Sequence, residues 1–251
     1  MTNKQKSPVD GIYCRYVKRL LDIVCAVLTL LVFWWLLLVV AVIVRAHFGA
    51  PVIFKQPRPG KIDRETGQER IFYLYKFRTM TNERDENGEL LPDVQRLTHF
   101  GKLLRATSLD ELPEVWNILR GDMSVIGPRP QLVRDMVFMS KEHRTRHVVR
   151  PGLSGLAQIS GRNALAWENK FRVDLEYIRH ISFIYDVKIV FGTVVNVLKR
   201  SSKADEIDIC ADYGDYLLEH HLIDRDCYDE KQLEAKKILE GVKSGKSSCD
   251  R

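Results

Sequence analysis

The feature that most constrains this chain is an uncharged apolar run of 22 residues from Ile23 to Val44. As an α-helix the run would measure about 33 Å, enough to cross a hydrocarbon core of about 30 Å. A core helix of this length usually carries a polar stripe, and this run carries none. The run is too long for the apolar part of a signal peptide, and no small-residue cleavage site follows it. We therefore expect residues 1–50 to form a membrane-inserted anchor.

The two flanks of the run leave its path through the membrane open. Lys18 and Arg19 precede it and Arg45 and Lys55 follow it, so the positive-inside rule gives no orientation. The length favours a crossing helix, whereas two basic flanks favour a segment that dips in and returns to the same face. A return requires a break in the helix, usually at Pro or Gly. The middle of the run instead holds Trp34-Trp35, which breaks nothing by itself.

The distribution of charge divides the remaining chain into a basic body and an acidic tail. Residues 1–200 carry 31 Lys and Arg against 20 Asp and Glu, and residues 201–251 carry 8 against 13. A body with a net charge of +11 is expected to face lipid headgroups, nucleic acid or phosphorylated substrates. The apolar content of 45% excludes a disordered chain. The five cysteines show no C-x-x-C spacing, so neither a zinc site nor a disulfide framework is predicted.

The spacing of apolar residues after the anchor predicts a compact, mainly helical α+β domain. Strands over 51–55 and 71–80, joined by a long polar loop, predict a small β-hairpin. An amphipathic helix over 182–199 either faces the core or lies in the membrane interface. Further helices are expected over these ranges: 94–105, 108–120, 131–147, 164–180, 212–222 and 228–241. We expect a catalytic domain over 51–200 and a separate tail over 201–251.

The sequence Ser108-Leu109-Asp110-Glu111 fits a capping box at the start of a helix. One interpretation is purely structural: Ser108 caps the helix and the two acids offset its dipole. The other is chemical, because an ionised carboxylate can attack phosphorus, and Mg²⁺ suits one or two carboxylates together with substrate phosphates. Attack by one anion on another requires cations nearby. The candidates are Lys76, Arg78, Arg105, Arg129 and Arg150, with Asp174 as a further carboxylate; each is equally compatible with a structural role.

Several motifs occur in a characteristic order between about residues 15 and 200: Tyr75–Met80, Ser108–Pro113, Asn117–Ser124, Gly127–Pro130 and Arg150–Gly152 followed by Gly155–Gln158. With these motifs the chain resembles the bacterial sugar transferase family, specifically its small monotopic phosphoglycosyl transferases. The resemblance implies an enzyme that moves a phosphosugar from a UDP-sugar to undecaprenyl phosphate and releases UMP. It also implies a re-entrant helix, interfacial helices and a β-hairpin. One departure is that the family commonly has Ser-Pro where this chain has Trp34-Trp35.

The resemblance assigns roles to the candidate residues. It implies that Asp110 is the nucleophile that carries the phosphosugar and that Glu111 is the Mg²⁺ ligand. It places Lys76, Arg105, Arg129 and Asp174 among active-site residues, and Arg78 and Arg150 are further candidates for substrate binding. The implied location is the cytoplasmic face of the bacterial inner membrane, where such enzymes begin glycan assembly.

Other readings of the sequence stay open. Asp110 could act as a base or metal ligand in a ternary complex, without a covalent intermediate. A non-enzymatic membrane-tethered binder would explain the basic body but not the ordered motifs, and no nucleic acid partner is expected. The acidic tail could recruit downstream glycan-assembly enzymes. Neither the sugar nor the oligomeric state follows from the sequence.

Overall fold

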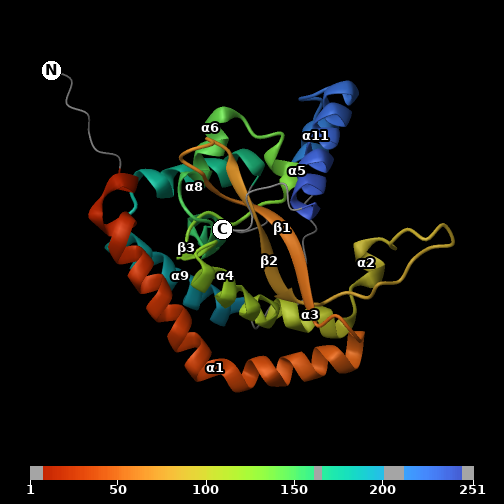
Figure 1. The fold of residues 1–251 in the computed structure, drawn as a ribbon, viewed down its shortest axis with the longest axis horizontal. Helices are drawn as coiled ribbons and strands as arrows, with labels where there is room; N and C mark the ends of the chain where they lie inside the picture. The colour runs from red at the N-terminus through yellow and green to blue at the C-terminus, as the bar shows by residue number, and fades with distance from the viewer. Residues whose placement is uncertain (1–7, 161–165, 201–211, 245–251) are drawn as a thin grey trace.

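The apolar run forms a single helix in the computed structural model, which describes residues 8–160, 166–200 and 212–244. This helix, α1 (Lys18–Phe48), follows one π-helical turn over Tyr13–Val17. Among the described residues it is the one helix long and apolar enough to cross a membrane. Figure 1 shows that α1 is bent, although it contains neither Pro nor Gly. The Thr29 hydroxyl donates to the Cys25 carbonyl at 2.8 Å, a contact that bends helices slightly.

Both ends of α1 pack against the same domain. Near the start, the Asp22 carboxylate accepts hydrogen bonds from the Ser124 hydroxyl at 2.9 Å and the Val125 amide at 2.8 Å. Near the end, Val44 is fully buried in a cluster with Phe77. Many apolar side chains between the two ends are exposed, among them Leu28, Leu31, Val32, Phe33, Trp34, Trp35 and Leu38. Both ends of α1 therefore contact one domain, while apolar side chains of its middle stay exposed.

The predicted hairpin is confirmed, with a longer first strand than expected and a second strand that begins and ends earlier than expected. Strand β1 (Ile53–Ile62) runs antiparallel to β2 (Glu69–Phe77), with Ile53 opposite Phe77. β1 extends through Pro57 and Pro59, which are tolerated because a two-stranded sheet has only edge strands. Alternate residues of a strand share one face, and Phe72 and Leu74 pack against α1 and α4. Lys76 continues this face toward the site described below.

The next predicted helices are present but shorter than expected. The helix predicted over 94–105 is divided into α2 (Asp93–Arg96) and α3 (His99–Ala106). The division falls at Thr98, whose hydroxyl accepts a hydrogen bond from the Gly101 amide and caps α3. The helix predicted over 108–120 begins as a 3₁₀ turn over Leu109–Glu114 and continues as α4 (Val115–Arg120).

The prediction of a single helix over 131–147 is wrong. The segment forms two one-turn helices, α5 (Val133–Met136) and α6 (Lys141–Arg144), and a 3₁₀ turn over Thr145–Val148. Local side-chain bonds favour short turns here, since the Ser140 hydroxyl accepts from the His143 amide. Flanking this segment, β3 (Ser124–Ile126) pairs in parallel with β4 (Gly152–Ser154). That pairing was not predicted, because three-residue strands leave too short a pattern.

Helices α7 (Leu156–Ile159), α8 (Trp167–Arg179) and α9 (Phe183–Arg200) follow. The amphipathic segment buries one face and exposes another: Ile189 of α9 is fully buried, whereas another face of the helix is apolar and exposed. The exposed residues are Phe183, Ile184, Val187, Val190, Phe191 and Val194. An exposed apolar face of this size is typical of a surface in contact with a membrane or a partner. Two polar residues between α7 and α8 that are further candidates for ligand contact from the sequence, Arg162 and Asn163, lie outside the described residues.

The C-terminal helices pack against the rest of the chain. They are α10 (Tyr213–Glu219) and α11 (Arg225–Lys243), close to the ranges predicted for them. Ala235 and Val242 of α11 are buried in one cluster with Ile71 of the hairpin and Val133 of α5. Figure 1 shows α11 beside α5. The described part of the acidic tail is therefore packed onto the region that follows Gly127–Pro130.

Candidate active site

The turn that carries Asp110 and Glu111 does not begin with the predicted capping box. Ser108 has a φ of 57°, in the left-handed region, and its side chain makes no capping hydrogen bond. Such a conformation of a non-glycine residue costs about 1–3 kcal/mol and is found preferentially at functional sites. The Glu111 amide donates to the Ser108 carbonyl at 3.2 Å, so the turn closes through the backbone. The Glu111 carboxylate is therefore available for other partners.

Three carboxylates surround the ammonium of Lys76. The Lys76 Nζ lies 2.8 Å from Glu111 Oε1, 3.3 Å from Glu114 Oε1 and 4.0 Å from Asp110 Oδ2. Lys76 comes from the end of β2, and the three acids come from the 3₁₀ turn that packs against it. Lys76, one of the candidate cations of the sequence, thus lies beside the acidic pair. We call Asp110, Glu111 and Glu114 the carboxylate cluster.

Arg129 supplies a second cation to the cluster. Its Nη2 lies 3.0 Å from Glu111 Oε1, and its side chain is 45% exposed. The backbone around it is held by two other arginines. Arg146 Nη2 donates to the Arg129 carbonyl at 2.7 Å, and Arg58 Nη1 donates to the Pro130 carbonyl at 3.1 Å. The backbone at Arg129 is therefore fixed by these two hydrogen bonds as well as by the two flanking prolines.

The three carboxylates differ in their readiness to ionise. Burial raises the pKa of Asp110, although the Lys76 charge acts against it. For Glu111, burial is outweighed by Arg129 and Lys76, which together hold the pKa of this carboxyl far below its usual range. Burial raises the pKa of Glu114 to about 7 in spite of the nearby Lys76. Carboxylates whose pKa values are pushed apart in this way are typical of catalytic sites.

A third cation lies near Asp110. Arg105 Nε donates to the Thr79 hydroxyl at 3.1 Å, and the Arg105 charge lowers the pKa of Asp110. The prediction that Arg105 belongs with the acidic pair is therefore consistent with the structure. Three cations therefore lie at or beside the cluster, and the 45%-exposed Arg129 keeps donors that can reach a phosphate oxygen.

The remaining predicted substrate-binding residues make their contacts elsewhere. Arg78 donates to the carbonyls of Met80 and Phe48 at 2.9 Å each, which ties the end of α1 to β2. Arg150 Nε donates to the Gly121 carbonyl at 2.7 Å. Asp174 is 3% exposed and pairs with Arg146 at 2.6 Å, so its carboxylate reaches the cluster only through Arg146 and the Arg129 backbone.

Three residues of the site were missed in the sequence. Glu114 was treated as an ordinary residue of the helix predicted over 108–120, although its offset of three from Glu111 places both on one side of a tight turn. Arg146 lay at the end of the wrongly predicted helix, and Arg58 in the hairpin loop. Only the offset of Glu114 was a signal that the sequence offered.

The carboxylate cluster fits one mode of Mg²⁺ binding. Within the described residues, no group of three or more His, Cys, Asp or Glu side chains is arranged to hold a metal ion by itself. Mg²⁺ is, however, commonly bound by one or two carboxylates together with substrate phosphates and water. The neighbouring carboxylates of Asp110 and Glu111 match that donor set. In this structure Lys76 and Arg129 contact them.

Comparisons with known proteins find a family match and several relatives of this chain. Residues 13–200 match the family described as bacterial sugar transferase. The "Uncharacterized sugar transferase EpsL" of Bacillus subtilis is 46% identical over 72% of this chain and 87% of the relative. A UDP-N-acetylgalactosamine-undecaprenyl-phosphate N-acetylgalactosaminephosphotransferase of Aeromonas hydrophila is 37% identical over 73% of this chain but 44% of the relative. A UDP-glucose:undecaprenyl-phosphate glucose-1-phosphate transferase of Xanthomonas campestris is also 37% identical, over 76% and 40%.

The chain thus spans most of the first relative and less than half of the other two. The carboxylate cluster, Lys76 and Arg129 all lie within the matched region, whereas α10 and α11 lie beyond it.

Proposed function

The chain belongs to the bacterial sugar transferase family, and from that premise we propose that it transfers a phosphosugar from a UDP-sugar to undecaprenyl phosphate and releases UMP. The observation that carries the proposal is the buried Asp110 carboxylate, 4.0 Å from Lys76 and beside a Glu111 that Lys76 and Arg129 hold. The names of two relatives include a UDP-sugar and undecaprenyl phosphate, which supports the same substrate classes here.

In the first step we assign Asp110 as the nucleophile. A carboxylate oxygen of Asp110 forms a bond to the phosphorus that carries the sugar, and the bond from this phosphorus to the UMP oxygen breaks. UMP leaves with the electron pair of that bond. Lys76 and Arg129 offset the negative charge that gathers on the phosphoryl oxygens, because both cations already lie at the cluster. Arg105 serves the same purpose on the side of Asp110.

In the second step a phosphate oxygen of undecaprenyl phosphate forms a bond to the same phosphorus. The bond to Asp110 breaks, its electron pair returns to the carboxylate, and the products are undecaprenyl-diphosphosugar and free enzyme. Because UMP leaves before the acceptor reacts, the two large substrates can use the same nucleophile one after the other. A ternary complex, in which Asp110 acts as a base or metal ligand, makes the same products without an Asp110 adduct.

The activity is tested by UMP release from a panel of UDP-hexoses and UDP-N-acetylhexosamines, with undecaprenyl phosphate and Mg²⁺. Release of UMP from at least one donor, dependent on the acceptor in steady state, supports the proposal. No release from any donor, by a folded protein in nanodiscs, contradicts it. The panel also identifies the sugar, which neither the sequence nor the relatives determine.

Glu111 is proposed to be the Mg²⁺ ligand, with Asp110 as its neighbour. When bound, Mg²⁺ would neutralise charge on the donor diphosphate. Replacing Glu111 with Gln is expected to raise the Mg²⁺ concentration needed for half-maximal activity by about tenfold, the loss expected of one charged contact worth roughly 1.4 kcal/mol. A Mg²⁺ titration of UMP release measures the shift. The matched control is Glu142→Gln, on exposed α6, and an unchanged titration for Glu111→Gln would remove the ligand role.

The domain is proposed to lie on the cytoplasmic face of the inner membrane, with α1 dipping into the bilayer and returning. Its exposed apolar middle and the exposed face of α9 support this placement. In a background with all five cysteines replaced, single cysteines at Ile12 and Thr66, before and after α1, are expected to resist an impermeant thiol reagent applied to whole cells. Both should react in inverted membrane vesicles. Labelling of one position in whole cells and the other only in vesicles would show a crossing helix instead.

A further inference from the structure

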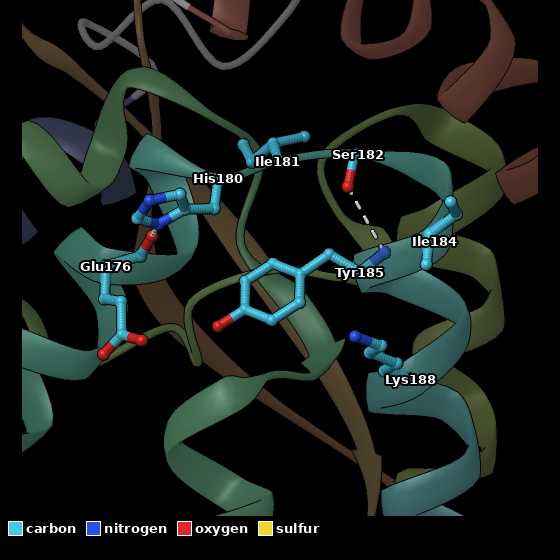
Figure 2. Close-up of a pocket in the computed structure, with 7 residues that line it drawn as sticks. All are labelled: Glu176, His180, Ile181, Ser182, Ile184, Tyr185 and Lys188. Atoms are coloured by element: carbon cyan, nitrogen blue, oxygen red, sulfur yellow. Dashed lines mark hydrogen bonds between the residues drawn. The ribbon is translucent and has the colours of Figure 1, made fainter.

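An open cleft lies where α8 ends and α9 begins, away from the carboxylate cluster. Its volume is about 510 Å³. Figure 2 shows the side chains that line it: Glu176, His180, Ile181, Ser182, Ile184, Tyr185 and Lys188. The turn between the helices is fixed locally, because the Tyr185 amide donates to the Ser182 hydroxyl at 3.3 Å. His180 Nδ1 lies 3.0 Å from the Glu176 carbonyl, which holds its ring against the end of α8.

The cleft presents opposite charges from its two helices. Glu176 stands on α8 and Lys188 on α9, with the Tyr185 ring between them (Figure 2). Both charged residues are exposed, and within the described residues neither forms a salt bridge. Tyr185 is half-buried and stacks on Tyr177, with ring centroids 6.0 Å apart. The two charges therefore face a common space without neutralising each other.

The position of the cleft relative to the exposed apolar face of α9 indicates how deep in a membrane the cleft would lie. Residues in a helix follow one another at about 100°, so Lys188 lies roughly one turn from Ile184, at the border between the exposed apolar face and the buried face. Ile184 is 68% exposed and Phe191 72%. If these side chains lie among acyl chains, Lys188 and Glu176 lie near the headgroups. Long basic side chains at such borders keep their charge in the interface.

We propose that this cleft binds the headgroup of a phospholipid that carries both a phosphate and a primary ammonium, as in phosphatidylethanolamine. Lys188 pairs with the phosphate, and the ammonium donates hydrogen bonds to the Glu176 carboxylate and to the Tyr185 hydroxyl, which points toward Glu176 (Figure 2). A purely anionic headgroup has no cationic group to pair with the Glu176 carboxylate and would be repelled by it. A trimethylammonium headgroup has the right charge but no N–H donor, so it is bound less well.

The test uses the full chain in nanodiscs made of equal parts phosphatidylethanolamine, phosphatidylglycerol and phosphatidylcholine. Native mass spectrometry measures which lipids stay bound when the protein is released. We expect the wild type to retain phosphatidylethanolamine several-fold over the other two lipids. Lys188→Ala should reduce retention of phosphatidylethanolamine and phosphatidylglycerol alike, whereas Glu176→Gln should lower the ratio of phosphatidylethanolamine to phosphatidylglycerol. The matched controls are Lys141→Ala and Glu142→Gln on exposed α6, which should retain the wild-type pattern.

Three outcomes overturn the proposal: no preference in the wild type, a preference that survives both cleft variants, or a loss that the α6 controls share. A further measurement, in which inorganic phosphate is added, distinguishes a lipid site from a site for free phosphate. Displacement of the bound lipid by millimolar inorganic phosphate would show a phosphate site and contradict the lipid assignment. UMP release is measured in the same nanodiscs and is expected to persist in both cleft variants. Absence of UMP release in the wild type would bear on the proposed function alone.

Discussion

Replacing Asp110 with Asn is expected to lower UMP release by at least about 10³-fold, the scale on which removal of a covalent nucleophile acts. Asn has the shape of Asp but offers no anionic oxygen to phosphorus. The fold should survive, because burial raises the pKa of Asp110 and the ionised form is therefore held at a cost to folding. A neutral Asn removes that cost, so the midpoint of thermal unfolding should stay unchanged or rise.

Asp226→Asn is the matched control, since Asp226 is an exposed aspartate in the first turn of α11, beyond the matched region, and this variant should keep full activity. In the wild type, incubation with donor alone should leave a phosphosugar on Asp110, detectable by mass spectrometry of its peptide. An adduct absent under conditions that release UMP would support the ternary complex. Near-normal activity of Asp110→Asn would exclude Asp110 both as the covalent nucleophile and as the base or metal ligand of a ternary complex.

The sequence pointed to some of the residues that meet in the cluster but not to how they are held. Lys76, Asp110, Glu111 and Arg129 were named as candidates because they lie in motifs with local patterns, whereas Glu114 was not. The left-handed Ser108 had no such pattern, since S-x-x-E fits a capping box equally well. The pairing of Asp174 with Arg146 joins residues 28 positions apart. The sequence alone does not distinguish a buried arginine from a solvated one.

The fold shows the same division between local and distant interactions. Long periodic segments, such as the anchor and the helices near 167–179 and 183–200, were predicted close to their observed bounds. The segment 131–147 was not, because side-chain caps at Asp135 and Ser140 overrode its apolar spacing. The path of α1 was left open by Trp34-Trp35, and it depends on contacts such as Asp22 with Ser124 that only the folded chain reveals.

The buried pair of Arg146 and Asp174 leads to the second large effect. Arg146 is 1% exposed, contacts Asp174 through Nε at 3.0 Å and Nη2 at 2.6 Å, and donates to the Arg129 carbonyl. Arg146→Met leaves the Asp174 carboxylate buried without its partner, so we expect a loss of about 3–5 kcal/mol in the free energy of unfolding. Urea unfolding measures the loss, and exposed Arg172→Met on α8 is the control, with little change expected.

A second variant separates support of the fold from the positioning of Arg129. Replacing both partners, in Arg146→Met with Asp174→Leu, removes the unpaired charge and should restore most of the stability, because well-packed apolar residues often replace a buried ion pair without loss. The Arg129 carbonyl still lacks its donor in this double variant. If the pair positions Arg129, the KM for the UDP-sugar should stay raised about tenfold, the loss expected when one hydrogen bond to a charged donor is worth about 1.5 kcal/mol. Recovery of the wild-type KM together with stability would show that Arg146 and Asp174 serve the fold alone.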